Sequence, residues 1–511
     1  MYNISENGSQ LHPVMLVGTG SDVGKSVLAT ALCRIFRQDG FHPAPFKAQN
    51  MALNSFATPD GLEIGRAQAV QAEAAGVACS TDMNPILLKP NSEHTTQVVL
   101  NGKPIGNRSA YDYFRHEGRE ELRVQVQQAF DRLSSRFNPI VMEGSGSVSE
   151  LNLRDTDLVN MPMARYANAD VILVADIDRG GVFASCYGSV MLQTEEDRRR
   201  IKGIIINKFR GDIRLFESGR RMIEDLCHVP VLGVVPMFND IVIEEEDSVQ
   251  LQSKLRSLQE GKVNIAVVLL RHMSNFTDFD VLERNEQVNL FYTSNMRDIE
   301  SADIIILPGT KATLDDLYEL RRNGVAQSIL RAHKDGKLII GICGGFQILG
   351  LSVSDPDGVE GNIPMLPGLG LLPVSTVMTA DKTTRQVEFN FNGATCKGYE
   401  IHQGRTTIDK ASAKVPHDES SHTEGYQTES SPSESHVFDR SFIEENNCIG
   451  TYIHGFLDNP SVISYLLRGR TKGKVETTDV DAFKQEQYDK LAAHVRKYVD
   501  IPLIYKILRG E

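Results

Sequence analysis

The sequence predicts an α/β fold with two domains, each built on a mostly parallel sheet flanked by helices. Three observations support this prediction. A chain of 511 residues is long enough for two or three domains. Short runs of Val, Ile and Leu alternate with amphipathic stretches, as is typical of parallel strands buried on both faces. Residues 241–262 are charged, helix-prone and without a strand core, so we expect the domain boundary there.

The apolar runs give the order of the elements. Strand candidates lie at residues 12–18, 139–143, 171–175, 203–207, 231–235, 264–270, 304–307 and 338–342. We therefore expect an N-terminal domain over residues 1–240, a linker at 241–262, a second domain over 263–470 and a C-terminal helical segment at 471–511. In that last segment, the apolar side chains of residues 483–499 form one helical stripe, which favours core packing.

One segment departs from this pattern. Residues 411–434 are rich in Ser, His, Glu and Thr and contain almost no aliphatic side chains. Such a segment buries too little apolar surface to order itself firmly, so we expect a polar insertion in the second domain. His417 and His422 lie within it, and this setting favours a solvated surface over a metal site.

Composition narrows the partners and the compartment. The chain has 54 Lys and Arg against 67 Asp and Glu, which argues against a nucleic-acid or anionic-membrane surface. No run is long enough to cross a bilayer, and the polar start of the chain does not resemble an export signal. Seven scattered cysteines do not form a disulfide framework, so we expect a cytoplasmic protein. The sequence does not indicate an oligomeric state.

Cys343 has the surroundings of a nucleophile. It follows an apolar strand and precedes an apolar helix start in the segment 338–350, LIIGICGGFQILG. The neighbouring glycines permit a tight turn between strand and helix, which is how a chain exposes a nucleophilic side chain at a sheet edge. A buried core cysteine is the alternative, and the glycines make it the weaker interpretation.

His454 is the candidate base for this cysteine. It ends a short β-type run in the segment 450–457, GTYIHGFL, and a fold can bring such distant residues together. With the strand at 304–310, IIILPGT, the two segments resemble a class I glutamine amidotransferase domain. The resemblance implies that Cys343 attacks the side-chain amide of glutamine, that His454 transfers the proton, and that the backbone N–H groups of Gly309 and Gly344 form the oxyanion hole.

The segment after His454 departs from that family. Many class I domains read His-Pro-Glu, with the Glu orienting the imidazole, whereas Gly455 and Phe456 follow the histidine here. A backbone carbonyl or a distant carboxylate can orient the imidazole instead. The sequence leaves the orienting group open.

A phosphate-binding loop lies near the N-terminus, in the segment 14–28, VMLVGTGSDVGKSVL. A strand, a loop with Gly20 and Gly24, and an apolar helix form a cradle whose N–H groups hold phosphate oxygens. Lys25 would neutralise charge, and the Ser26 hydroxyl would bind magnesium. The first glycine stands one residue early, and this shifted loop resembles the dethiobiotin synthetase type, whose members activate a carboxylate with ATP.

Further polar residues end neighbouring strands, at the sheet edge where ligands bind. Glu143 follows an apolar strand, and by resemblance it is a magnesium ligand together with Ser26; a capping or salt-bridged Glu is the alternative. Asp176 and Asp178 end the next strand. Asn207, with Lys208 beside it, matches the position at which this superfamily recognises the nucleotide base.

A run of amides and hydroxyls suggests a substrate site. The segment 45–55, PFKAQNMALNS, follows the second strand, so its polar groups should face the phosphate loop. They can hydrogen-bond a polycarboxylate or amide-bearing substrate, whereas a plain polar loop is the alternative. The substrate-binding candidates are Lys47, Gln49, Asn50, Asn54 and Ser55.

Together with the segments 65–68, 84–90, 143–146 and 307–311, this run closely resembles the cobyric acid synthase family over nearly the whole chain. The resemblance implies amidation of four corrin carboxylates, with ATP, Mg²⁺, glutamine and a corrinoid polycarboxylate as small-molecule partners. Two alternatives stay open. One is cobyrinic acid a,c-diamide synthase, which uses the same two domains on an earlier corrin. The other is a P-loop ATPase whose amidotransferase-like domain is only an interaction module.

Overall fold

The computed structural model describes residues 10–90, 95–109, 113, 119–244, 258–409, 436–438 and 440–511. The predicted insertion at 411–434 and most of the predicted linker lie outside these residues. The chain forms two compact units, one of residues 1–246 with 480–511 and one of residues 247–479. The C-terminal helices, predicted as a segment of their own, therefore belong to the first unit.

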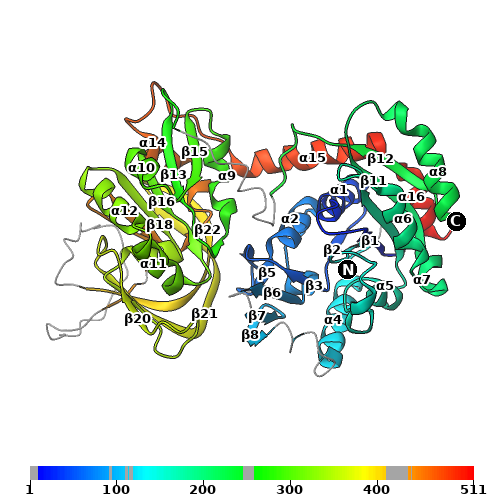
Figure 1. Cartoon of the computed structure of the whole chain (residues 1–511), viewed down its shortest axis with the longest axis horizontal. Helices are drawn as coiled ribbons and strands as arrows, with labels where there is room; N and C mark the ends of the chain where they lie inside the picture. Colours follow the sequence, from blue (N-terminus) through cyan, green and yellow to red (C-terminus); the bar gives the residue numbers. More distant parts are fainter. Residues whose placement is uncertain are drawn as a thin grey trace. The chain divides into compact units, whose positions relative to one another are not determined.

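A six-stranded sheet forms the centre of the first unit (Figure 1). Its order is β12-β11-β10-β1-β9-β2, and every neighbouring pair is parallel, as the apolar runs predict. The strands are β1 (Val14–Gly18), β2 (Ala44–Phe46), β9 (Ile140–Glu143), β10 (Asp170–Asp176), β11 (Ile201–Phe209) and β12 (Val231–Pro236). The carboxyl ends of β1, β9, β10 and β11 carry the predicted nucleotide-site residues to one edge.

Helices cover both faces of this sheet. One core cluster joins it to α1, α15 and α16, and the other joins it to α4, α5 and α6. The helices of this unit are α1 (Lys25–Gln38), α2 (Arg66–Ala75), α4 (Arg119–Ser134), α5 (Met161–Tyr166), α6 (Val182–Met191), α7 (Glu195–Arg200), α8 (Glu217–Cys227), α15 (Val480–Tyr498) and α16 (Ile501–Arg509). Leu491 and Val495 on α15 are buried beside α1, so the predicted helical stripe packs into the core.

Smaller elements complete the first unit. A mixed sheet has the order β3-β6-β7-β8, and β4 pairs with β5. The strands are β3 (Gln49–Met51), β4 (Ser55–Ala57), β5 (Glu63–Gly65), β6 (Ile86–Pro90), β7 (Thr95–Leu100) and β8 (Lys103–Ser109), and the short helices are η1 (Thr81–Met83), η2 (Leu151–Thr156) and η3 (Ile213–Phe216). The predicted substrate segment 45–55 thus runs from the main sheet into the smaller ones.

The second unit is built on another six-stranded sheet, of order β15-β13-β16-β18-β25-β24. All pairs are parallel except β24 with β25. The strands are β13 (Val263–Val268), β15 (Val288–Thr293), β16 (Ile304–Leu307), β18 (Leu338–Ile342), β24 (Phe442–Glu445) and β25 (Cys448–Thr451). The helices are α9 (Asp280–Arg284), α10 (Met296–Ser301), α11 (Thr313–Arg322), α12 (Val325–Lys334), α13 (Gly344–Leu349) and α14 (Pro460–Leu467), with η5 (Phe276–Phe279) and η6 (Phe456–Asp458). The two central sheets confirm the predicted fold class.

Further strands, mostly antiparallel, flank this second sheet. The long hairpin of β21 (Val374–Phe391) and β22 (Ala394–Ile408) dominates them, and β22 also pairs with β26 (Ile453–His454). The others are β14 (Met273–Ser274), β17 (Gly309–Thr310), β19 (Ser352–Ser354), β20 (Met365–Pro367) and β23 (His436–Val437). The pairing of β22 with β26 places His454 beside Tyr399 in register. Among the residues that the structure describes, no helix is long and apolar enough to cross a membrane.

Candidate active sites

Cys343 stands at a sharp turn between β18 and α13. Its backbone has φ 54° and ψ −112°, a region that L residues rarely adopt, so the surrounding fold must hold it there. Its N–H donates to the Thr451 carbonyl at 2.8 Å, and its Sγ lies 3.5 Å from the Ile401 carbonyl oxygen. A side chain at Gly345 would overlap the carbonyl oxygen of Leu307, which explains the glycine after the turn. The elbow predicted from the sequence is present.

His454 is held by a carboxylate that the sequence did not reveal. Its Nδ1 lies 2.7 Å from Oδ2 of Asp278, in η5, and the other oxygen of Asp278 accepts the Gly455 N–H at 2.9 Å. His454 and Asp278 are 1% and 3% exposed. Asp278 therefore fixes both the ring and the backbone beside it, and it answers the question left open by the missing His-Pro-Glu pattern.

The charges around His454 favour its protonated form. Burial alone would lower the pKa of the imidazole, but the Asp278 carboxylate, with a smaller contribution from Cys343, raises it to about 10. The Nε2 atom is buried and makes no hydrogen bond of standard geometry with any described residue, yet the cysteine is close enough to act on the imidazole pKa. Nε2 is therefore the nitrogen available to exchange a proton with the sulfur.

Gly309 and Gly344, the predicted oxyanion-hole residues, lie close to the Cys343–His454 pair. A side chain at Gly309 would come 3.4 Å from Cε1 of His454, and one at Gly344 would overlap Thr310. Gly344 is the first residue of α13, so its N–H has no acceptor within the helix. The structure brings these two glycines together around the cysteine. Their donation to an oxyanion stays a prediction.

The second site is the phosphate loop between β1 and α1. Gly24 precedes α1 with φ 96°, and a side chain there would overlap the amide of Asn207. The Lys25 ammonium donates to the carbonyl oxygens of Gly20 and Gly146, both at 2.9 Å. Burial lowers the pKa of Lys25 to about 8, although Glu143 opposes this shift. The lysine thus bridges the loop and the segment after β9.

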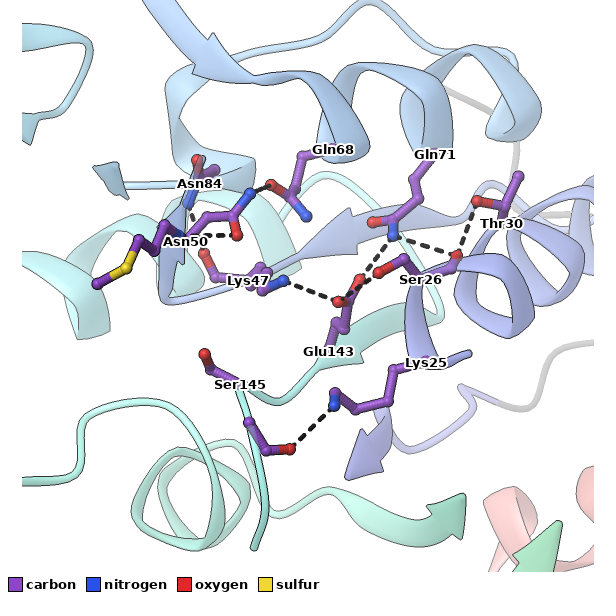
Figure 2. A network of polar contacts seen from close by, with 12 residues as sticks. Lys25, Ser26, Thr30, Lys47, Asn50, Gln68, Gln71, Asn84, Glu143 and Ser145 are labelled. Atoms are coloured by element: carbon purple, nitrogen blue, oxygen red, sulfur yellow. Dashed lines mark hydrogen bonds and ion pairs between the residues drawn. The ribbon is translucent and has the colours of Figure 1, made fainter. Parts of the chain in front are cut away.

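Glu143 lies at the centre of a polar network (Figure 2). Its Oε1 accepts from the Ser26 hydroxyl and from the Lys47 ammonium, both at 2.8 Å, and its Oε2 accepts from Nε2 of Gln71 at 2.8 Å. Burial alone would raise the pKa of Glu143, but these three partners, Lys47 foremost, lower it. The buried carboxylate is therefore ionised and compensated by a cation.

This network fits a divalent cation. A carboxylate and a hydroxyl that share one position are ligands that Mg²⁺ prefers, and Glu143 already holds a positive charge on the oxygen nearest to Ser26. Within the described part of the chain, no group of three or more His, Cys, Asp or Glu side chains is placed to hold a metal. A magnesium ion bound to Ser26 and Glu143 would take its other ligands from phosphate oxygens and water.

The remaining nucleotide-site candidates line the same edge. The Asn207 amide donates to the Val23 carbonyl at 2.9 Å, which ties β11 to the phosphate loop. Lys208 pairs with Asp176 at 3.1 Å and also donates to the Asp22 carbonyl. Asp178 instead pairs with an exposed arginine, Arg210, at 2.6 Å. Asn207 and Asp176 thus lie at the loop, whereas Asp178 faces outward.

The five substrate-binding candidates do not share one environment. Lys47 reaches Glu143, and Asn50 donates to Oε1 of Gln68 at 3.0 Å (Figure 2). Oε1 of Gln49 accepts from a tyrosine hydroxyl at 2.7 Å. Asn54 and Ser55 are completely buried.

The Ser55 hydroxyl belongs to a buried ion pair. It donates to Glu63 at 2.7 Å and accepts from Lys89 at 2.8 Å, and Lys89 pairs with Glu63 at 2.7 Å. Lys47 is therefore linked to the phosphate loop through Glu143, and Ser55 is part of the interior.

The comparisons with known proteins agree with this geometry. Residues 14–250 match the family model of the CobQ/CobB/MinD/ParA nucleotide binding domain, and residues 264–462 match that of the CobB/CobQ-like glutamine amidotransferase domain. These matches confirm the predicted pair of domain types.

Relatives resemble the chain along its whole length. A protein of Bacteroides fragilis named cobyric acid synthase is 67% identical over 503 residues, covering 98% of each chain. Proteins with the same name from Phocaeicola vulgatus and Parabacteroides distasonis are 65% and 55% identical, each covering 98% of this chain and 99% of the relative.

Proposed function

Given that the chain belongs to the cobyric acid synthase family, we propose that it amidates the b, d, e and g carboxylates of adenosylcobyrinic acid a,c-diamide to give cobyric acid, a step of cobalamin biosynthesis. Glutamine supplies the nitrogen, and ATP activates each carboxylate. The observation that carries the proposal is the pairing of a Cys343–His454–Asp278 site with a phosphate loop whose Lys25 and Ser26 lie beside Glu143.

The first half-reaction releases ammonia from glutamine. His454 takes up the thiol proton before the attack, as an imidazolium that the Asp278 carboxylate favours, and the Cys343 sulfur then attacks the carboxamide carbon; the N–H groups of Gly309 and Gly344 would stabilise the negative oxygen that forms. His454 then gives the proton to the leaving nitrogen, and a thioester remains. Water hydrolyses the thioester to glutamate, with His454 as the base. Asp278 keeps the imidazole oriented throughout.

The second half-reaction consumes the ammonia. A corrin carboxylate attacks the γ-phosphorus of ATP, which gives an acyl phosphate and ADP. Ammonia then attacks the acyl carbon, and inorganic phosphate leaves with the C–O bond electrons. Lys25 would offset the charge of the transferring phosphoryl group, Asn207 would contact the base, and Lys47 would receive the carboxylate; their contacts with Gly20, Val23 and Glu143 at the phosphate loop support these roles. Mg²⁺ held by Ser26 and Glu143 would neutralise phosphate charge.

The cysteines and the net charge bear on the compartment and the partners of the protein. All seven cysteines are unpaired in the structure, and we propose a reducing cytoplasm as the compartment. The partners are the small molecules of the reaction, namely a corrinoid polycarboxylate, glutamine and ATP. The acidic balance of charge favours neither nucleic acid nor an anionic membrane as a partner.

Two observations bear on the alternative functions. Against cobyrinic acid a,c-diamide synthase stands the name of the full-length relatives, which are cobyric acid synthases. Against a purely binding role stands Cys343, because a strained backbone with a buried His–Asp pair beside it is typical of catalysis. A panel of corrinoid acids, with the amidated products counted by mass spectrometry, separates the first alternative from the proposal.

The test of the amidotransferase assignment uses Cys343→Ala. This variant should lose glutamine-supported amidation and retain amidation when ammonium chloride supplies the nitrogen, because ammonia bypasses only the first half-reaction. ADP release and product mass are measured for both nitrogen sources. Glutamine-supported activity in the variant would overturn the role of Cys343.

A further inference from the structure

A group of polar residues beside the nucleophile helix takes no part in the steps above. It surrounds Thr313, the first residue of α11, and includes Lys311, Gln347, Glu360 and Gln403. Gln347 stands one turn beyond the nucleophile, because its N–H donates to the Cys343 carbonyl at 3.2 Å. The group therefore adjoins the helix that begins at the nucleophile.

The Gln347 side chain is fixed at both ends. Its Nε2 donates to the Gln403 carbonyl at 2.9 Å and to the Tyr452 hydroxyl at 3.1 Å, and its Oε1 lies 3.2 Å from the Thr313 hydroxyl. It is 3% exposed. Gln347 thus ties α13 to β22 and to the start of α11, and its amide has little freedom to rearrange.

Glu360 lies on the other side of Thr313. Its Oε2 accepts the Thr313 N–H at 2.8 Å, whereas its Oε1 is 3.4 Å from a hydroxyl whose single proton has a shorter contact with Gln347. Asp355 accepts N–H groups of Val359 and Glu360, which holds the loop in place. Within the described residues, Glu360 makes no ion pair, so one oxygen of this carboxyl is poorly satisfied.

The environment of Glu360 suits an incoming cation. The residue is partly accessible, yet burial of its carboxyl raises the pKa of Glu360 to about 7, with Lys311 opposing the shift. A carboxyl in such a place gains more from a positive ligand than one in water does. The structure therefore offers an anchor for a positive group close to the nucleophile.

Lys311 offers the opposite charge. It follows Gly309 by two residues, and its ammonium lies 3.3 Å from Oε1 of Gln403. Gln403 in turn follows Ile401, whose carbonyl contacts the Cys343 sulfur. Lys311 is near enough to Glu360 to act on its pKa without forming an ion pair with it. A negative and a positive group thus lie next to residues that contact the nucleophile helix and the strand beside the sulfur.

We propose that Glu360 binds the α-ammonium group and Lys311 the α-carboxylate of the substrate glutamine, so that this pair selects the free amino acid. The inference rests on the proposed function and names residues that recognise its nitrogen donor. An extended chain from the α-carbon to the amide carbon of glutamine spans about 4 Å, given C–C bonds of about 1.5 Å. One helical turn, about 5.4 Å, separates the backbones of Cys343 and Gln347, and the Gln347 amide contacts Thr313 and Gln403, the neighbours of Glu360 and Lys311.

Truncated substrates distinguish binding of the α-groups of glutamine from a purely structural role of Glu360 and Lys311. Glutaramate lacks only the α-amino group, and 4-aminobutyramide lacks only the α-carboxylate. Glu360→Gln should raise KM for glutamine about 10- to 100-fold, which is the loss of one charged hydrogen bond, and leave KM for glutaramate nearly unchanged. Lys311→Met should likewise raise KM for glutamine and leave KM for 4-aminobutyramide nearly unchanged. Ammonia release is measured with each substrate.

Further variants and assays serve as controls for the Glu360 and Lys311 experiments. Glu319→Gln, on the exposed surface of α11, should leave KM for all three substrates unchanged. Ammonia-supported amidation should stay at the wild-type rate in Glu360→Gln. Equal losses with glutamine and glutaramate would show that Glu360 only holds the loop, and would overturn the inference. A wild type that releases no ammonia from glutamine would instead refute the proposed function. If Glu360→Gln fails to fold, Lys311→Met with 4-aminobutyramide decides the question.

Discussion

Both candidate active sites contain a buried carboxylate, but the two carboxylates are used differently. Asp278 binds a single side chain, His454, together with the neighbouring backbone N–H of Gly455. Glu143 binds three side chains, among them the Lys47 ammonium and the Ser26 hydroxyl. Asp278 would keep its partners through the proposed reaction, whereas Glu143 would exchange at least one of its partners on binding a magnesium ion.

We therefore expect the contacts of the Cys343 site to persist when substrates bind, and those of the Glu143 site to change. In the amidotransferase unit, the candidate nucleophile, base and orienting acid act on one another directly, and none of these contacts has to be replaced. In the nucleotide unit, Lys25 and Lys47 are held by protein oxygens that a triphosphate and a metal ion would replace. Variants of the first site should change the rate of chemistry, and variants of the second should also change how substrates bind.

The largest effect is expected from Asp278→Asn. An asparagine amide would donate to Nδ1 of His454, so Nε2 would carry the proton and could not accept one from Cys343. Glutaminase kcat should fall by about 10³- to 10⁴-fold, as expected when an orienting acid imposes the wrong tautomer. Ammonia release from glutamine measures this loss.

Ammonia-supported amidation is the control for Asp278→Asn, and it should stay at the wild-type rate. A small loss of glutaminase activity, below about tenfold, would mean that another group orients the imidazole. Asp278 would then not be the residue that keeps His454 oriented.

Glu143→Gln should give the next largest effect. A neutral amide cannot hold a divalent cation as the carboxylate does, so ATP-dependent amidation should fall by about 10²- to 10³-fold, a loss of several kcal/mol. Unlike Asp278→Asn, the loss should be the same with glutamine and with ammonia. ADP release with each nitrogen source measures it. An activity that ammonia restores would show that Glu143 does not serve the nucleotide.

Continuous apolar runs made the central sheets predictable. The run at 304–307 is strand β16 and the run at 338–342 is strand β18, to the residue. Such strands are buried on both faces, so their sequence alone marks them. The hairpin of β21 and β22 was not predicted from the sequence, because many of its residues are exposed and its stability comes from pairing between its strands.

The site residues divide in the same way. Cys343, Lys25 and Ser26 stand in local motifs, with glycines that signal the required turn. Asp278 is 176 residues from His454 in the sequence, and no local pattern marks it, because only the fold brings the two together. Gln71 had a weak signal, three residues after the segment 65–68, and its contact with Glu143 needed the packing of α2.

A third prediction concerns stability. Lys47→Met removes the cation from Glu143 and should destabilise the first unit by about 3 kcal/mol, since it leaves a buried charge without its partner. Lys47 lowers the pKa of Glu143, so in the wild type this carboxylate contributes stability above its ordinary pKa. In Lys47→Met the pKa of Glu143 rises above its ordinary value. The free energy of unfolding of the variant should therefore fall as the pH rises from the ordinary pKa to the raised one. Calorimetric unfolding at pH 5 and pH 7.5 measures this inversion.

Added Mg²⁺ and ATP provide the control for Lys47→Met. If a magnesium ion binds Glu143, it replaces the missing positive charge and should restore part of the lost stability. Equal stabilisation of the variant and the wild type by Mg²⁺ and ATP would mean that the ion does not take the place of the lysine on Glu143.

The smallest expected effect is a difference in the pH above which each of the two sites loses its function. Burial lowers the pKa of Lys25 to about 8, so the ligand-free loop loses its positive charge above that pH and binds ATP more weakly. Asp278 outweighs the burial of His454 and raises its pKa to about 10, so the glutaminase site keeps its imidazolium up to that pH. ATP affinity should decline about tenfold per pH unit above 8, while glutaminase kcat/KM stays level until about 10. Titration calorimetry with ATP and ammonia release from glutamine, both between pH 7 and 10.5, would show two separate limits. A shared limit would mean that one group controls both sites.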